Sequence, residues 1–263
     1  MNKEIKNFYV DKEALMFTLM QSKEMQKINN NKVPPKTSLS KHDTKAGKNG
    51  AADAIKNIDD IEVAKEWLLN KPERFKNSIN NIRDYMLFVI GCNTARRIGD
   101  IIQFTFGTFM SDKGVFKTHF EIKEQKTGKR IRILINNNVK EAIKLYIDKK
   151  YPNNDYDLNT HLFLSRTQKI KGIYDGNNPI TRQQAWNIYN KMGKAIGLQQ
   201  KGLRISCHTP RKTWAYQTIK QNEGNSYVLT EVQEMLNHSS GRTTLRYAGI
   251  DQEDKDSLME QGV

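Results

Sequence analysis

The sequence has little cysteine and no long apolar run. Cys92 and Cys207 are its only cysteines, and their spacing matches no metal-binding pattern, so no bound metal is expected. Because no signal peptide is indicated, free thiols in a reducing cytosol are favoured over a disulfide between the two. No segment is apolar for long enough to span a membrane, and no Gly-rich loop of the nucleotide-binding kind occurs. The sequence therefore predicts a cytoplasmic protein that needs no cofactor.

Acidic residues are too few to balance the basic ones. The chain has 43 Lys and Arg against 29 Asp and Glu, which gives a formal net charge of +14 over 263 residues. Such an excess favours a polyanionic partner, of which nucleic acid is the commonest, and a generic charged surface is the alternative. Apolar residues make up 37% of the chain, which suffices for one good-sized core or two modest ones.

The start of the chain does not have the pattern of a compact domain. Residues 11–28 have the composition of one helix, and the stretch after them is rich in Asn, Lys, Pro and Gly, which is typical of a basic linker. Such a linker can lie along a DNA backbone or be solvated. We therefore divide the chain into an N-terminal helix and linker, 1–57, and a compact domain, 58–263. Its acidic end, 248–263, is expected to be a tail helix that docks on another subunit.

The apolar spacing of the compact domain predicts a mainly α fold with a small antiparallel β-sheet, of the α+β class. One helix is expected to begin at Pro72 and to end at a break over Gly91–Thr94, and the next to begin near Ala95. Arg97 and Asp100 then share a face of that second helix, where the default for such a pair is a surface ion pair.

Two segments with alternating apolar residues, 116–122 and 131–135, flank a Gly-containing turn. They predict a β-hairpin with Lys126 at its tip. A solvated charge is the ordinary role of one lysine in a turn.

Three helix starts are marked by capping residues. Thr181 with Gln184, and Thr230 with Gln233, have the spacing of capping boxes. Thr209 can cap a third helix that has proline at its first position. The helix after Thr181 has a polar, basic outer face that can contact DNA or be ordinary solvated surface. Its candidate DNA-binding residues are Arg182, Gln183, Lys191 and Lys194.

Four residues near the end of the chain have the chemistry that phosphoryl transfer requires. Arg211 is expected in the first turn of its helix, where free backbone N–H groups and the helix dipole favour an anion. His208 and His238 are titratable near neutral pH, and Tyr247 can act as a covalent nucleophile. A cation, two imidazoles and a phenol together suit the cutting of a phosphodiester.

Several motifs together carry a resemblance to a known family. They are Thr94–Asp100, Gln125–Gly128, His208–Arg211, Leu236–Ser240 and Tyr247. In this order they resemble the boxes of the tyrosine recombinases, the phage integrase family, over roughly residues 58–250. The resemblance implies the tyrosine-recombinase catalytic-domain fold.

The chain departs from the family pattern in places. Arg96 fills a position that is usually apolar, Pro210 replaces a leucine, and Asn237 replaces a glycine. Most members carry a helical core-binding domain that closes a clamp around DNA before the catalytic domain. Residues 1–57 are therefore expected to be an incomplete or reduced core-binding region.

The resemblance implies a site-specific DNA recombinase, an integrase. In that reaction Tyr247 attacks a DNA phosphodiester and gives a 3′-phosphotyrosine and a free 5′-hydroxyl, without metal or ATP. Lys126 protonates the leaving 5′-oxygen, and Asp100 supports Arg97 by orienting it. The implied catalytic residues are Arg97, Lys126, His208, Arg211, His238 and Tyr247.

The expected partners are double-stranded DNA and other copies of the chain, which is a monomer in solution and forms a synaptic tetramer on DNA. DNA integration by a mobile element is the expected setting. Two alternatives stay open. A type IB topoisomerase-like nicking-closing enzyme uses a similar set of residues, and a non-catalytic DNA-binding accessory protein needs only the basic surface.

Overall fold

The structure is a computed structural model that describes residues 52–71, 78–165, 176–250 and 259–260. The helix expected at 11–28, most of its linker and most of the tail at 248–263 lie outside the described residues. The chain divides into two compact units, Met1–Asn49 and Gly50–Val263, and all the described residues belong to the second. The assignment of 1–57 and 58–263 to separate regions stays a prediction.

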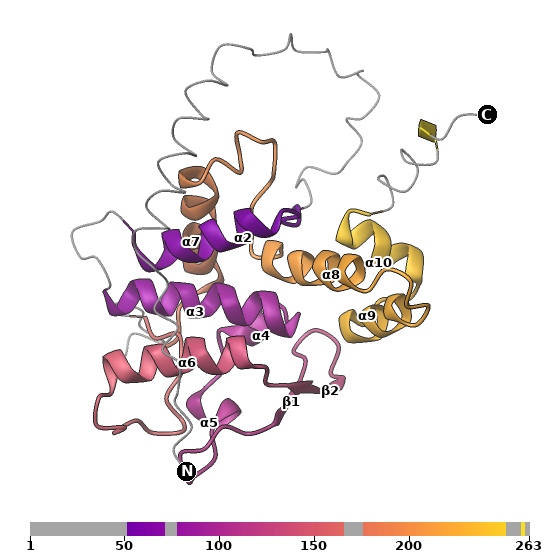
Figure 1. Cartoon of the computed structure of the whole chain (residues 1–263). Helices are drawn as coiled ribbons and strands as arrows, with labels where there is room; N and C mark the ends of the chain where they lie inside the picture. The colour runs from indigo at the N-terminus through magenta and orange to yellow at the C-terminus, as the bar shows by residue number, and fades with distance from the viewer. Residues whose placement is uncertain (1–51, 72–77, 166–175, 251–258, 261–263) are drawn as a thin grey trace, which may run out of the picture. The chain divides into compact units, whose positions relative to one another are not determined.

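The described part of this unit is mainly helical, with a two-stranded antiparallel sheet at one edge (Figure 1). The helices are α2 (Ile58–Leu69), α3 (Ile79–Thr94), α4 (Ile98–Ile101), α5 (Phe106–Phe109), α6 (Asn137–Lys150), α7 (Arg182–Ala195), α8 (Thr209–Gln221), α9 (Val228–Leu236) and α10 (Gly241–Ala248). The strands are β1 (His119–Lys123) and β2 (Arg130–Leu134). The expected mainly α fold with a small antiparallel sheet is confirmed. None of the described helices is long and apolar enough to cross a membrane.

Helix α3 is the central helix of the unit. Helices α2, α6 and α8 all contact it, and Figure 1 shows α2 and α6 on its two sides. The side chains of Met86, Phe88 and Ile90 in α3 are fully buried. Burial of one such side chain is worth about 1.5–3 kcal/mol relative to its exposure. Helix α3 is therefore the framework against which α8, with Arg211 in its first turn, is held.

The bounds of α3 differ from those that the apolar pattern predicts. The helix begins at Ile79 instead of Pro72, because Ser78 has an extended backbone and its hydroxyl caps the helix. It then runs through Gly91, where the sequence predicts a break. A Cβ on Gly91 would lie 2.8 Å from the Cβ of Pro210 in α8. This glycine therefore permits the close approach of two helices and does not form a turn.

The chain turns sharply after α3. Ala95 has a left-handed backbone with φ of 56°, and Arg97 is extended, so α4 begins only at Ile98. The predicted helix start near Ala95 is therefore wrong, because the left-handed backbone of Ala95 delays the helix to Ile98. The turn buries Arg96 completely and leaves Arg97 partly exposed.

The predicted β-hairpin is confirmed. Strands β1 and β2 pair antiparallel, with His119 opposite Leu134 and Lys123 opposite Arg130. Lys126 lies in the connecting turn. Gly128 closes that turn with φ of +71°, a conformation that glycine adopts without the steric cost of a Cβ.

Helix α8 begins with a different capping residue than expected. His208 is the N-cap, so Thr209 and Pro210 occupy the first two helical positions. The Thr209 hydroxyl accepts a hydrogen bond from the N–H of Ser206 at 3.0 Å and so closes the turn before the helix. Arg211 still lies in the first turn of α8, as the sequence predicts.

One predicted capping box is confirmed and the other is wrong. Thr181 and Gln184 exchange side-chain-to-backbone hydrogen bonds of 3.0 and 2.8 Å at the start of α7. Thr230 instead lies inside the first turn of α9, which has Tyr227 as its N-cap. The Oδ1 of Asn225 accepts the N–H of Tyr227 at 3.0 Å, a local turn that lets the helix begin earlier.

A smaller apolar cluster joins the last three helices to the turn after α3. Its buried members are Ala95, Ala215, Val232, Leu236, Ala248 and Ile250. These residues come from α8, α9, α10 and the segments beside them. The cluster therefore holds α10, which carries Tyr247, against α8, which carries Arg211.

Candidate active site

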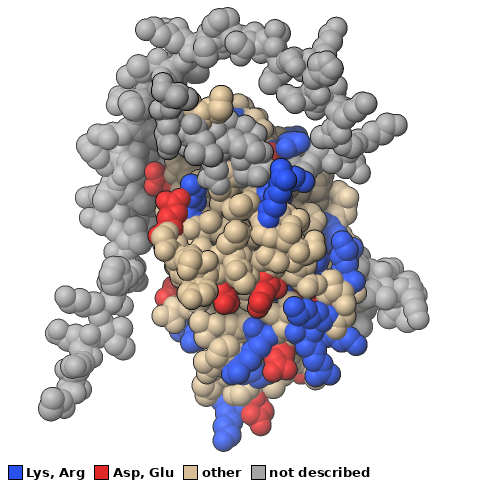
Figure 2. Space-filling view, turned by 90° about the vertical axis from the view of Figure 1, so that its right-hand side faces the viewer, with Lys and Arg blue, Asp and Glu red and all other residues tan. Residues whose placement is uncertain are grey.

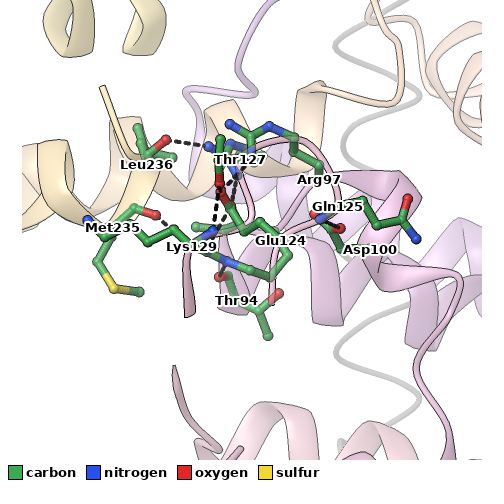
Figure 3. A network of polar contacts seen from close by, with 12 residues as sticks. Thr94, Arg97, Asp100, Glu124, Gln125, Thr127, Lys129, Met235 and Leu236 are labelled. Carbon is green, nitrogen blue, oxygen red and sulfur yellow. Dashed lines mark hydrogen bonds and ion pairs between the residues drawn. The ribbon is translucent and has the colours of Figure 1, made fainter. Parts of the chain in front are cut away.

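Two arginines from distant segments converge on one buried carboxylate. Arg97, before α4, places its Nη1 2.8 Å from Oε2 of Glu124. Arg211, in α8, places its Nη1 3.9 Å from Oε1 of the same residue. The Glu124 side chain is fully buried at the end of β1, and Arg97 and Thr127 both converge on it (Figure 3). The predicted pair of catalytic arginines thus comes together.

Backbone carbonyls fix the plane of the Arg211 guanidinium. Nη1 donates to the carbonyl of Ala95 at 2.7 Å, and Nη2 donates to the carbonyl of Leu236 at 2.8 Å. A guanidinium has five N–H donors, so three are left for other acceptors. Burial lowers the pKa of Arg211, and the nearby charge of Arg97 lowers it further. The site therefore holds a cation that an incoming anion would stabilise.

Tyr247 lies beside these cations. No hydrogen bond of good geometry holds its buried hydroxyl among the described residues. Burial raises the pKa of Tyr247, while the positive charges of Arg211 and Arg97 offset part of that rise. Lys212, which sequence reasoning did not select, places its Nζ 4.9 Å from the centroid of the Tyr247 ring, a cation–π contact.

His238 is brought to Tyr247 by the turn after α9. Asn237 has a left-handed backbone with φ of 54°, which ends the helix and redirects the chain. The ring of His238 then meets that of Tyr247 edge-on, with centroids 4.9 Å apart. Burial lowers the pKa of His238, and the charges of Arg211 and Arg97 lower it further. His238 is therefore a neutral hydrogen-bonding group near pH 7.

A pocket of about 620 Å³ brings Lys126 and His208 together with Arg97. Its lining residues are Arg97, Ile98, Gly99, Asp100, Gln125, Lys126, Arg182, Cys207 and His208. Partial burial lowers the pKa of His208, as do the charges of four cations around it: Arg211, Lys212, Arg97 and Lys126. A neutral His208 can accept a proton, and Lys126, exposed in the hairpin turn, can donate one.

Asp100 does not pair with Arg97 among the described residues. Its Oδ1 accepts the backbone N–H of Gln125 at 3.0 Å, which ties α4 to the hairpin turn (Figure 3). Arg97 is the extended N-cap of α4, so the side-by-side placement of residues three apart within a helix does not apply to it. The supporting role of Asp100 stays a prediction. In the structure its carboxylate contacts the hairpin turn and not Arg97.

Sequence reasoning missed Glu124 and the role of Arg96. Glu124 lies two residues before Lys126, and its carboxylate among many basic hairpin residues was a signal that could have marked it. Arg96 is an arginine at a position that is usually apolar in the family, which was a second signal. Arg96 Nη1 bonds Glu124 Oε1 at 3.0 Å, and Nη2 donates to the carbonyl of Met235.

The predicted DNA-binding residues of α7 all lie on its exposed face. They are Arg182, Gln183, Lys191 and Lys194. Arg182 also lines the pocket, and its Nη2 approaches Gln125 Oε1 at 3.5 Å. Exposed Lys and Arg side chains of the hairpin form a second basic surface, and such side chains gather on the lower part of the face shown in Figure 2. This basic hairpin comprises Lys123, Lys126, Lys129, Arg130 and Arg132.

Known proteins match the chain in both sequence and fold. The sequence matches the profile of the Phage integrase family over residues 64–254. The probable integrase/recombinase YoeC of Bacillus subtilis strain 168 is 34% identical over 200 residues, which are 76% of this chain and 90% of the relative.

Solved structures show the same fold. The XerA recombinase matches with a TM-score of 0.54 and 16% identity, over 81% of this chain and 67% of its own. The XerH recombinase bound to a palindromic difH substrate matches with a TM-score of 0.55 and 19% identity, over 82% of this chain and 54% of its own. A lambda integrase dimer bound to a COC′ core site matches with a TM-score of 0.51 and 16% identity, over 79% of this chain and 63% of its own. The chain thus spans about half to two thirds of the length of these structures.

The fold is that of the tyrosine-recombinase catalytic domains among these structures. The family match covers most of the chain and includes every sequence motif that predicted the site. The chain belongs to the phage integrase family of tyrosine recombinases.

Proposed function

We propose that the chain is a site-specific DNA recombinase that cuts and rejoins strands through a covalent bond between Tyr247 and a DNA 3′-phosphate. The observation that carries this proposal is the Tyr247 hydroxyl, which is buried within the field of Arg211 and Arg97. A phosphodiester bound there has a nucleophile beside its phosphorus and two guanidinium groups beside its oxygens.

The arginines stabilise the charge that develops during attack. The pentacoordinate phosphorane gains negative charge on its non-bridging oxygens, which charge-assisted hydrogen bonds from Arg97 and Arg211 offset. The carbonyl contacts of Arg211 hold its remaining donors in place before DNA binds. Donors fixed in advance in this way contribute about 100- to 1000-fold each to the rate of comparable reactions. His238 adds a hydrogen bond to one of the same oxygens.

Bonds and protons balance without any further reactant. The Tyr247 oxygen forms a bond to phosphorus, and the bond from phosphorus to the 5′-oxygen breaks. The phenolic proton passes to His208, and the 5′-oxygen takes a proton from Lys126. Because the phosphotyrosine keeps the energy of the phosphodiester, a 5′-hydroxyl from another strand can reverse the reaction. Strand exchange therefore needs no ATP, and Arg97 and Arg211 supply the positive charge that a metal would otherwise provide.

Double-stranded DNA is the proposed substrate, and further copies of the chain are the proposed partners. The exposed face of α7 and the basic hairpin each contribute one cation, Arg182 and Lys126, to the lining of the pocket, and further exposed cations for the DNA backbone. The XerH and lambda relatives were solved bound to DNA, the latter as a dimer, which supports both partners. Four copies on two DNA duplexes would form the synaptic complex.

A covalent adduct is the direct test. The substrate is a nicked duplex from the boundary of the DNA element that encodes the chain. Cleavage releases the short fragment that carries the new 5′-hydroxyl, and its loss traps the adduct. The wild-type chain is expected to form a DNA adduct that resists denaturation, and Tyr247→Phe to form none. Tyr227→Phe, at an exposed position, is the matched control and should keep the adduct. No wild-type adduct would contradict the proposal.

Products distinguish recombination from its nearest alternative. A recombinase given two duplex sites should yield Holliday junctions and exchanged strands. A nicking-closing enzyme should instead relax a supercoiled plasmid that carries a single site. Relaxation without exchange would therefore reassign the chain to the second class.

A further inference from the structure

Glu124 occupies an unusual position for a carboxylate. Its side chain has no exposed surface, yet three guanidinium groups surround it. Oε1 bonds Arg96 Nη1 at 3.0 Å, and Oε2 lies 2.8 Å from Arg97 Nη1. These contacts and the hydrogen bond from Thr127 lower the pKa of Glu124, despite its burial, so the group is ionised near pH 7.

The same carboxylate also fixes the hairpin turn. Oε2 accepts the Thr127 hydroxyl at 2.7 Å, and the Glu124 carbonyl accepts the N–H of Gly128 at 2.8 Å. Lys126 lies between Glu124 and Thr127 in the chain, so the turn that carries it is held before and after it. One side chain thus links the turn of Lys126 to the guanidinium of Arg97.

Arg96 extends this link to the His238 segment. Its side chain is fully buried, and it donates to the carbonyls of Thr94 and Met235 as well as to Glu124. Met235 lies in the last turn of α9, directly before the turn that presents His238. Burial lowers the pKa of Arg96 to about 10, which leaves it charged and in need of its carboxylate partner near pH 7.

We propose that Glu124 is a positioning residue that holds Arg97 and the Lys126 turn in one arrangement beside Arg211 before DNA binds. This inference rests on the proposed function and adds a residue that prepares the same site. Without the carboxylate, three guanidinium groups of like charge would repel one another inside a buried space. With the carboxylate present, the charge of Arg96 is neutralised, and Arg97 and Arg211 keep their remaining N–H donors for the phosphate.

A simple countercharge would have the opposite effect on the rate. If Glu124 only weakened the positive field, its neutralisation would make the site more cationic and would speed attack on a phosphodiester. If Glu124 positions the arginines, its neutralisation slows attack, because the donors no longer meet the phosphate oxygens. The sign of the change in rate therefore separates the two roles.

Glu124→Gln tests the sign, since it keeps the shape and removes the charge. Single-turnover cleavage of the nicked duplex, at saturating protein, is expected to fall roughly 100-fold, the size of effect that a misplacement of about 1 Å causes. DNA affinity is expected to stay equal or to rise. Glu121→Gln, an exposed carboxylate on the same strand, is the matched control and should cleave at the wild-type rate. Cleavage by Glu124→Gln at or above the wild-type rate would overturn the proposal.

A double-mutant cycle tests whether Glu124 acts through Arg97. Arg97→Ala combined with Glu124→Gln should lose less activity than the product of the two single losses, because one of the groups that Glu124 positions is already absent. Independent losses that multiply would overturn the proposal. If Glu124→Gln does not fold, Arg96→Met with Glu124→Gln removes both buried charges together. That folded variant should show the same slow cleavage and unchanged DNA affinity, and wild-type cleavage by it would overturn the proposal.

A readout without chemistry separates this inference from the proposed function. The Nε–H signals of Arg97 and Arg211 in NMR spectra of the DNA-free chain should be sharp and protected from solvent in the wild type. In Glu124→Gln the Arg97 signal should be averaged and exchange fast, whereas the Arg211 signal should persist because its carbonyl contacts remain. An unchanged Arg97 signal would overturn the positioning role. A wild-type chain that forms no adduct would refute the proposed function, and these spectra would still decide the role of Glu124.

Discussion

The ring of Tyr247 packs edge-on against the ring of His238, with centroids 4.9 Å apart and planes inclined by 69°. The two residues come from α10 and from the turn before it. His238 Nδ1 also lies 3.2 Å from the hydroxyl of Thr244, one turn before Tyr247 on α10. The proposed nucleophile and an imidazole proposed to bind the phosphate therefore lie in one short segment, and a change in the turn reaches both.

Asn237→Ala is expected to weaken both stability and cleavage. Asn237 is left-handed, with φ of 54°, and alanine in that conformation costs about 1–2 kcal/mol. Urea unfolding should show this loss, and adduct formation should slow because His238 shifts relative to Tyr247. Asn237→Gly is the control, since glycine adopts this conformation readily and should keep the wild-type rate. Equal stability of the two variants would contradict the expectation.

Arg211→Lys is expected to keep DNA binding and to lose cleavage. Lysine preserves the charge, but its single ammonium group cannot bond the carbonyls of Ala95 and Leu236 and also present a fork to phosphate. Adduct formation should fall by about 100- to 1000-fold, and a carbonyl left without a donor should cost about 1–3 kcal/mol in unfolding free energy.

A gel-shift titration and the adduct assay check the Arg211→Lys prediction. Arg130→Lys, an exposed substitution of the same kind on β2, is the matched control. Near-normal cleavage by Arg211→Lys would remove Arg211 from the site.

Lys126→Ala is expected to slow cleavage of ordinary DNA by about 100- to 10,000-fold, the range of general acid catalysis. A substrate with sulfur in place of the 5′-bridging oxygen should restore the rate, because a thiolate leaves without protonation. Lys144→Ala, at an exposed position on α6, is the control and should cleave both substrates like the wild type. If the sulfur substrate gives no rescue, Lys126 is not the acid.

Stability is expected to fall with pH below neutrality. Folding lowers the pKa of both His208 and His238 from the ordinary value of 6.5, so below that pH the unfolded chain binds more protons. Their contribution is complete above the unfolded value and is lost as the pH falls through the lowered values. Urea unfolding between about pH 8 and about pH 5 should show this decline.

Histidine variants check the source of the pH dependence. His208→Asn with His238→Asn should give a flatter profile than the wild type over the same range. His119→Asn, on the hairpin, is the control and should keep the wild-type slope. A double variant with the wild-type slope would assign the decline to other groups.

Much of the site follows from local pattern. The hairpin with Lys126 follows from alternation and a glycine turn, and the first-turn position of Arg211 follows from the residues around Pro210. Both depend on contacts between near neighbours in the chain, which sequence spacing encodes. The bounds of the helices were harder to predict from the sequence. Gly91, for example, permits the close approach of α3 to Pro210, a residue far along the chain.

Sequence by itself determined which residues are proposed to carry the chemistry, their order in the chain, and the family to which the chain belongs. Only the tertiary structure decided how they are paired. It paired Arg97 with Glu124, directed the Asp100 carboxylate at the backbone N–H of Gln125, and buried Arg96. The reason is physical: a buried charge is stabilised by whichever opposite charge lies within a few ångströms, and that distance is set by packing rather than by separation along the chain.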